Sequence, residues 1–260
     1  MASTETVQAP ARLITFPPSG DCENSRWLLD YYAINYQEER HTLPFLLFTV
    51  KLNHGNAFPL YLDKNLTING LRPMIDHFDG LAPNNKKLIP EGQEEETNRL
   101  WTRYNSDMAL ATVYWSYFHL LKHWKIMFDP LSIGTPGYER FSVKYLYPPP
   151  AGLLWLFKLS QQKADESLTT LRTVFAEVSQ RLSDGRPYLL GDRMTIADIA
   201  FAASGAPLVL PLGYGGYPGE KGPLPSFEDA PPEFQSVVKE MLQTPAGEFV
   251  LRMYREERYR

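Results

Sequence analysis

The chain of 260 residues is 43% hydrophobic and 22% charged, which is sufficient for one large core or two modest ones. A formal net charge of −4 gives no basic surface for nucleic acid, and no apolar run is long enough to span a membrane. The first dozen residues are small and polar and lack the apolar core of a signal peptide. A single cysteine excludes an internal disulfide and fits a reducing compartment. Together these features predict a soluble, cytoplasmic protein.

Strand and helix patterns alternate from residue 11 to residue 82. Apolar residues at helical spacing, such as Trp27, Leu28 and Tyr31, mark the first helix. The predicted strands are residues 12–16, 36–41, 57–63 and 65–68, and the predicted helices are residues 22–34 and 72–78. The last two strands are expected to form a hairpin. This order predicts a small α/β layer.

The pattern becomes helical beyond a polar, proline-bearing linker at residues 81–96. The predicted helices span residues 93–128 and 151–183, with shorter ones after Thr195 and at residues 231–243 and 245–258. Residues 213–232 are rich in Gly and Pro and are predicted to form a surface loop. The sequence thus predicts an α/β domain followed by an all-α domain.

Three motifs stand out along the chain: SGDCENSRW at residues 19–27, LNHGNAFPLYL at 52–62 and YLLGDRMTIADIAFA at 188–202. They resemble the serine-type active-site pattern, the cis-proline pattern and the Gly-Asp-x-x-Thr-x-Ala-Asp pattern of cytosolic glutathione S-transferases. The stretch TPAGEFVLRMYREER is similar to a long, bacterial-like branch of that superfamily. The resemblance implies a thioredoxin-like glutathione-binding domain at residues 11–82. An all-helical domain with the acceptor-substrate pocket follows at residues 93–260.

The motif around Thr195 has a structural explanation. Thr195 can cap a helix while Asp198, three residues later, accepts a hydrogen bond from the amide of the cap residue. We therefore interpret this motif as a folding element without a catalytic role.

The dipeptide Phe58-Pro59 is a candidate binding element. Taken alone, it fits an ordinary trans proline that opens an edge strand. The resemblance implies instead a cis bond, which is uncommon and usually marks a backbone with special geometry. In the family, the residue before this proline binds the cysteinyl part of glutathione through its main-chain N–H and C=O groups.

Ser19 is the candidate catalytic residue. A helix N-terminus stabilises an anion, and a thiol with a pKa of about 8.5 is mostly protonated at neutral pH. A hydroxyl that donates to the sulfur of glutathione would favour the reactive thiolate. The alternative is that Ser19 only caps the helix.

Cys22 is a competing candidate. A thiol in the first turn of a helix has a lowered pKa and could form mixed disulfides with glutathione. The alternative is a small buried residue that packs against the core.

The sequence departs from the family pattern where glutathione's γ-glutamyl group would bind. The family usually has Glu-Ser or Asp-Ser there, whereas this chain aligns either Asn69-Gly70 or Gly70-Leu71, and Pro73 mildly favours the later helix start. The missing carboxylate and hydroxyl would together cost ~2–4 kcal/mol of binding free energy. Ala57 replaces a Gln or Lys and removes another contact.

Tyr104, Tyr114 and Tyr117 are candidates for lining an apolar acceptor pocket, although side chains in such helices are commonly core. His119 and His123 lack a third ligand, so no metal site is predicted.

The motifs predict a homodimeric glutathione transferase with a detoxification role. Glutathione would be the cofactor and a small apolar electrophile the partner substrate, and neither a nucleic acid nor a membrane partner is expected. Two alternatives remain: glutathione-dependent reductase or peroxidase chemistry at Cys22, and a non-catalytic ligand-binding or interaction protein that kept the fold.

Overall fold

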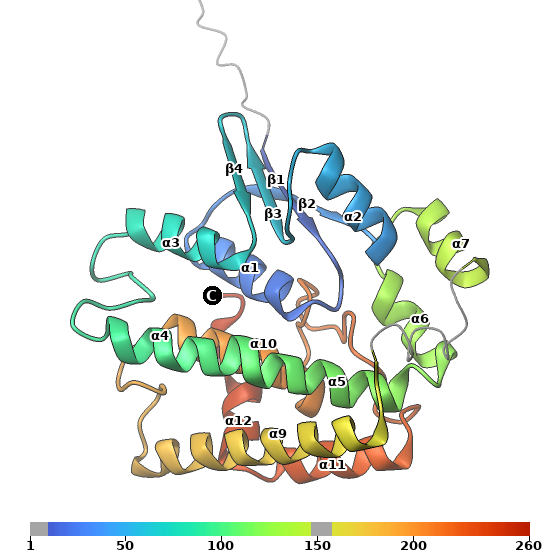
Figure 1. Ribbon diagram of the computed structural model, residues 1–260. Coiled ribbons are helices and arrows are strands. Elements are labelled where there is room, and N and C mark those ends of the chain that lie inside the picture. Colours follow the sequence, from blue (N-terminus) through green and yellow to red (C-terminus); the bar gives the residue numbers. More distant parts are fainter. Residues whose placement is uncertain (1–9, 147–157) are drawn as a thin grey trace, which may run out of the picture.

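The computed structural model describes residues 10–146 and 158–260. A sheet lies at one end of the molecule and a bundle of helices at the other (Figure 1). The strands are β1 (Ala11–Thr15), β2 (Tyr36–Arg40), β3 (Leu60–Asp63) and β4 (Leu66–Asn69), in the spatial order β2-β1-β3-β4. β1 is parallel to β2 and antiparallel to β3, and β3 and β4 form the predicted hairpin.

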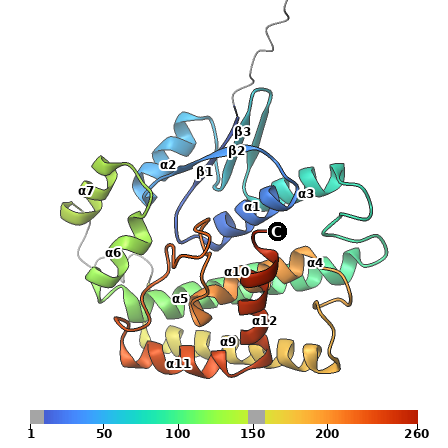
Figure 2. The ribbon, with the colours of Figure 1, turned by 180° about the vertical axis from the view of Figure 1, so that it is seen from behind.

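The helices of the sheet-containing half are α1 (Gly20–Tyr31), α2 (Leu43–Leu52) and α3 (Leu71–Leu81). Figures 1 and 2 show α1 and α3 between the sheet and the helical half, and α2 away from that interface. α1 is buried without interruption over residues 22–29, so the helix that follows Ser19 is fixed by packing on all sides.

Residues 43–52, to which the sequence pattern assigns no element, form α2. They are apolar nearly throughout, and Leu47, Phe48 and Leu52 are exposed. An apolar outer face hides the helical periodicity that would have identified this helix. Pro44 occupies the first turn, where its missing N–H costs nothing.

The second half is helical, and together with the mixed sheet it confirms the predicted fold class. Its helices are α4 (Glu94–Thr102), α5 (Ala109–Leu120), α6 (Trp124–Ser132), α7 (Gly137–Tyr145), α9 (Gln161–Arg181), α10 (Ile196–Val209), α11 (Pro232–Leu242) and α12 (Pro245–Arg252). The shorter helical segments are η1 (Arg103–Met108), η2 (Leu182–Asp184) and η3 (Met253–Glu257), of which η1 and η3 are π-helical.

Two helix predictions in this half need correction. The expected single helix over residues 93–128 contains the π-helical η1 and is broken before α6, where His123 leaves the helical backbone region with φ −111° and ψ 72°. The expected helix over residues 151–183 corresponds to α9, which begins at Gln161; residues 151–157 lie outside the described residues.

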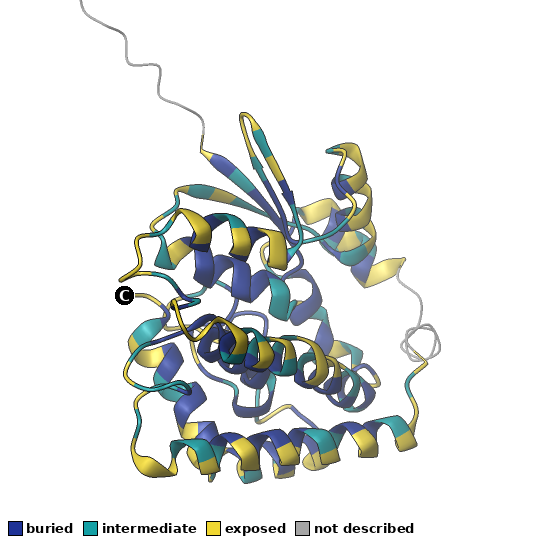
Figure 3. Ribbon diagram, turned by 60° about the vertical axis from the view of Figure 1, so that its left-hand side comes forward, coloured by how far each residue is buried: buried dark blue, intermediate teal, exposed yellow. Residues whose placement is uncertain are grey.

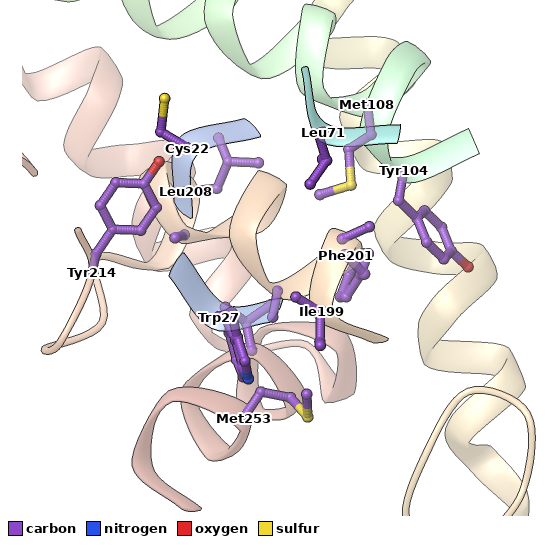
Figure 4. Close-up of a cluster of buried hydrophobic side chains, with 14 of the residues drawn as sticks. Cys22, Trp27, Leu71, Tyr104, Met108, Ile199, Phe201, Leu208, Tyr214 and Met253 are labelled. Atoms are coloured by element: carbon purple, nitrogen blue, oxygen red, sulfur yellow. The ribbon is translucent and has the colours of Figure 1, made fainter. Parts of the chain in front are cut away.

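α10 is the centre of the helical half. Almost all of its residues are buried, which is typical of a helix that is apolar on every side. Buried residues concentrate between the sheet and the outer helices (Figure 3). In α10, Ile199, Phe201 and Leu208 lie among side chains from α1, η1 and η3 (Figure 4). The predicted capping box is present, with the N–H and hydroxyl of Thr195 donating to the carboxylate of Asp198 at 2.7 and 2.6 Å.

The Gly- and Pro-rich segment between α10 and α11 is not simply a surface loop. Tyr214, Gly215 and Leu224 are buried, and Tyr214 is only 1% exposed. The segment passes along α1 and makes hydrogen bonds to it and to the residues that precede it. Within the described residues, no helix is long and apolar enough to cross a membrane.

Candidate functional site

The sheet register gathers three predicted site segments at one edge. Leu60 of β3 pairs with Ile14 of β1 and with Asn69 of β4. The end of β1, the start of β3 and the end of β4 therefore lie side by side. Pro59 lies at this edge, and its C=O accepts the N–H of Gly70 at 2.8 Å. Ser19 follows at the end of the loop that leaves β1.

Ser19 is the N-cap residue of α1, with an extended backbone conformation at φ −70° and ψ 126°. Its Oγ accepts the N–H of Cys22 at 3.4 Å, and its own N–H donates to the C=O of Phe16 at 3.2 Å. Among the described residues the Ser19 hydroxyl donates no hydrogen bond. The side chain is half-buried, so its proton is available to an acceptor that reaches this helix N-terminus.

The Phe58–Pro59 peptide bond is cis, as the resemblance implies. Phe58 precedes β3, and within the part of the chain that the structure describes its main-chain N–H and C=O have no hydrogen-bond partner. An extended peptide could therefore pair with Phe58 in the manner of an added strand.

Asn69 and Gly70, where a γ-glutamyl group is expected to bind, offer few side-chain groups for hydrogen bonds to it. α3 begins at Leu71, so Gly70 is its N-cap, and Gly70 has φ 85° and ψ 166°, a conformation that glycine readily adopts. The Oδ1 of Asn69 already accepts the N–H of Asn56 at 2.8 Å. Pro73 supplies no N–H to the first turn. Among the described residues the amide Nδ2 of Asn69 donates no hydrogen bond, so it remains a donor at this position.

Cys22 points into the core and is fully buried. Its Sγ accepts the N–H of Phe16 at 3.3 Å. Burial raises the pKa of the Cys22 thiol to about 11 despite the nearby Arg26 guanidinium. The group is therefore a protonated, inaccessible thiol at neutral pH.

A polar contact between the two halves lies beside this site, and no sequence motif predicts it. The Nδ2 of Asn105, on η1, donates to Asp21 at 3.1 Å, and the Nδ2 of Asn24 donates to the Oδ1 of Asn105 at 3.2 Å. Burial raises the pKa of Asp21, which the hydrogen bond from Asn105 partly offsets. π-helical turns such as η1 frequently occur at functional sites.

The structure does not bring the three candidate tyrosines together. Tyr104 is buried in the helical core with its ring 5.2 Å from that of Phe201. Tyr114 lies under the Nζ of Lys163 on α9, at 3.7 Å from the ring centroid. Tyr117 is half-buried and lies near Tyr214. Tyr214 in turn donates its hydroxyl to the C=O of Pro18, so Tyr117 is linked to the loop before Ser19 through Tyr214.

Within the described residues, no group of three or more His, Cys, Asp or Glu side chains is arranged to hold a metal ion. His119 is half-buried, and burial lowers its pKa. Its ring packs near Trp115, with the ring centroids 5.2 Å apart.

Comparison with known proteins agrees with the fold described above. Residues 161–233 match the sequence model of the glutathione S-transferase C-terminal domain. A glutathione transferase from Phanerochaete chrysosporium is similar in structure, with a TM-score of 0.61 at 13% identity over 95% of this chain and 97% of that one. A Ceriporiopsis subvermispora enzyme in complex with glutathione gives 0.59 at 14% identity, over 96% and 98%. A glutathione S-transferase from Sinorhizobium meliloti gives 0.55 at 20% identity, over 97% and 94%.

A comparison with curated proteins gave no match to the sequence. The fold is that of a thioredoxin-like domain joined to a glutathione transferase helical domain. The chain thus has the fold of glutathione S-transferases, and residues 161–233 match the sequence model of their C-terminal domain.

Proposed function

We propose that the protein is a glutathione transferase that conjugates glutathione to a small apolar electrophile. The observation that carries this proposal is the position of Ser19, an N-cap residue whose hydroxyl proton has no acceptor among the described residues. Ser19 follows β1 at the end of the sheet where Pro59 is cis and where the main chain of Phe58 has no hydrogen-bond partner among the described residues. Of the three candidate tyrosines, we assign Tyr117 to the pocket that binds the electrophile.

In this proposal Ser19 is a hydrogen-bond donor rather than a nucleophile. Its hydroxyl and the N-terminus of α1 stabilise the thiolate of glutathione, and the thiol proton passes to solvent. The sulfur then attacks the electrophilic carbon and displaces a leaving group or adds to the carbon. Phe58 holds the cysteinyl main chain through its N–H and C=O, which aligns the sulfur with Ser19.

The γ-glutamyl group would be held weakly. The Glu-Ser pair is absent, and Gly70 at the start of α3 has no side chain to replace the hydroxyl. We assign the Nδ2 of Asn69 to the γ-glutamyl carboxylate, because its Oδ1 is already used by Asn56. The ammonium group lacks an anionic partner at positions 69–71.

The two alternative functions differ in how well they fit the structure. Reductase or peroxidase chemistry at Cys22 requires an accessible thiolate, which the burial and raised pKa of Cys22 oppose. A non-catalytic ligand-binding or interaction protein is favoured by the missing Glu-Ser pair.

A glutathione-affinity column followed by two assays separates the three functions. Retention together with conjugation to a generic aromatic halide supports the transferase. Disulfide reduction without conjugation would support the Cys22 chemistry, and the absence of both activities would support the non-catalytic protein.

The proposal extends to a homodimer in the cytoplasm with a role in detoxification. Leu110 and Val113, exposed on α5, are apolar side chains that a second subunit could cover. Light scattering on the purified protein measures the oligomeric state and would show a single mass of one subunit if this part of the proposal is wrong.

A further inference from the structure

Tyr214 lies outside the gathered site segments but reaches the residue before Ser19. Its hydroxyl donates to the C=O of Pro18 at 3.1 Å. The side chain is 1% exposed and comes from the segment between α10 and α11, far along the chain from Ser19. Burial raises the pKa of Tyr214 well above its usual value, so the phenol remains protonated and able to donate.

This hydrogen bond fixes one side of a single peptide plane. The Pro18 C=O and the Ser19 N–H belong to the same planar peptide unit and point in opposite directions. Tyr214 binds the carbonyl, and the C=O of Phe16 accepts the N–H at 3.2 Å. The orientation of this plane sets φ of Ser19 and hence the direction in which its side chain leaves the backbone.

The neighbouring residue attaches the same segment to α1 at a second point. The N–H of Gly215 donates at 2.9 Å to Glu23, a fully buried carboxylate in the first turn of α1. Gly215 has φ 74°, and a Cβ there would lie 2.4 Å from the Cδ of Pro223, so another residue would disturb the segment. The hydrogen bond from Gly215 to Glu23 therefore holds Tyr214 at a fixed position beside α1.

We propose that Tyr214 is a positioning residue that directs the Ser19 hydroxyl toward the glutathione sulfur. This inference rests on the proposed function for its chemical meaning. Without the phenol, the Pro18–Ser19 peptide plane is held only through its N–H, and the hydroxyl samples orientations that do not point at the sulfur. Tyr214 and Gly215 thus orient the Ser19 hydroxyl without contacting the sulfur themselves.

The test is Tyr214→Phe, which removes the hydroxyl and keeps the ring, compared with Tyr217→Phe. Tyr217 belongs to the same segment, but its ring lies under the guanidinium of Arg40, 4.4 Å from the ring centroid. We expect Tyr214→Phe to lower conjugation at neutral pH about 2- to 10-fold and to raise the apparent pKa in the pH–rate profile. The KM for the electrophile should not change, and Tyr217→Phe should resemble the unmodified protein.

Amide hydrogen exchange of residues 19–23 gives a readout that needs no activity. We expect faster exchange there in Tyr214→Phe than in Tyr217→Phe, because the peptide plane loses one of its two anchors. If the protein binds no glutathione, the proposed function fails, and this comparison alone decides whether Tyr214 anchors the loop. If conjugation occurs and Tyr214→Phe changes neither the pKa nor the exchange, the positioning role is wrong while the proposed function stands.

Discussion

The carboxylate of Glu23 accepts the Nε–H of Arg258 at 2.8 Å, although the two residues are 235 positions apart in the sequence. Neither side chain is exposed. Glu23 also faces Arg26 at 3.3 Å, and Arg258 also binds Asp30 at 2.7 Å and lies over the ring of Trp27. The helix α1, which begins directly after Ser19, is therefore joined to Arg258 by a buried ion pair.

Breaking this ion pair should destabilise the protein strongly. Arg258→Met leaves a buried carboxylate that keeps only Arg26 as a cationic partner, and the free energy of unfolding should fall by about 3–5 kcal/mol. Denaturant unfolding measures the change. Arg260→Met is the matched control, because the side chain of Arg260 is 74% exposed and its loss should cost less than about 0.5 kcal/mol. An equal fall in the free energy of unfolding in the two variants would show that the buried ion pair stabilises the protein no more than an exposed one.

Removing the Ser19 hydroxyl should raise the pKa of bound glutathione and lower turnover. A charge-assisted hydrogen bond contributes about 1.5–3 kcal/mol, so Ser19→Ala should reduce the conjugation rate about ten- to a hundred-fold. The pH–rate profile is the measurement, because a folding defect would not move the pKa. Ser160→Ala is the control. Ser160 caps α9 by accepting the N–H of Lys163 at 3.2 Å, so this variant loses a helix cap on a different helix. A Ser160→Ala variant with the same shifted profile would contradict the role of Ser19.

The Cys22 thiol should be unreactive in the folded protein. Its pKa of about 11 and its complete burial leave little accessible thiolate at neutral pH. A thiol-specific reagent should therefore modify Cys22 slowly in buffer and rapidly in denaturant, and Cys22→Ala should leave conjugation nearly unchanged. Loss of all activity in Cys22→Ala, with Ser19→Ala active, would instead indicate a cysteine-type oxidoreductase.

Glutathione should bind weakly, and Asn69 should matter to the binding that remains. The carboxylate introduced by Asn69→Asp could still accept the N–H of Asn56, but it could not donate to the γ-glutamyl carboxylate, so affinity should fall about tenfold. Calorimetry measures both affinities. Asn65→Asp, an exposed hairpin position, makes the same charge change away from the site. Tight, micromolar binding by the unmodified protein, or tighter binding by Asn69→Asp, would mean that the γ-glutamyl group is oriented differently.

Asp198 should make stability depend on pH between about 4 and 6. Burial raises its pKa to about 6, although the amides of Leu189 and Thr195 donate to it. A folded-state pKa above the unfolded value of about 3.9 means that this contribution is fully present below pH 4 and is lost as the pH rises through 6. Between pH 4 and pH 7 the unmodified protein should lose about 2–4 kcal/mol more than Asp198→Asn. Parallel pH curves for the two proteins would show that Asp198 does not titrate in this range.

The sequence predicts those parts of the fold and site whose signals are local. Strands, caps and the Thr195–Asp198 box depend on neighbouring residues, and all of them are present. The position of Ser19 at the start of α1 follows from the Pro-Pro break and the helical spacing after it. α2 escapes prediction because its exposed face is apolar, which removes the periodicity that marks a helix.

Contacts between distant segments could not be predicted in the same way. The Gly- and Pro-rich composition around Tyr214 indicates a loop, yet whether a loop is exposed depends on what it meets, here Glu23 and Pro18. Arg258 likewise lies in a stretch of mixed charge that looks solvent-exposed in the sequence, and only its carboxylate partners on α1 explain its burial. The placement of Tyr104 in the core also depends on its packing against Phe201.

The all-round burial of α10 bears on how the molecule unfolds. A helix without a solvent-facing side cannot remain folded when the layer on either side of it departs, because each departure exposes apolar surface. Trp27 and its neighbours on α1 form one of those layers, and the Glu23–Arg258 pair joins the same layer to the last helical turn. The sheet-containing half and the helical half should therefore melt as one cooperative unit, with neither acting as a separately stable module.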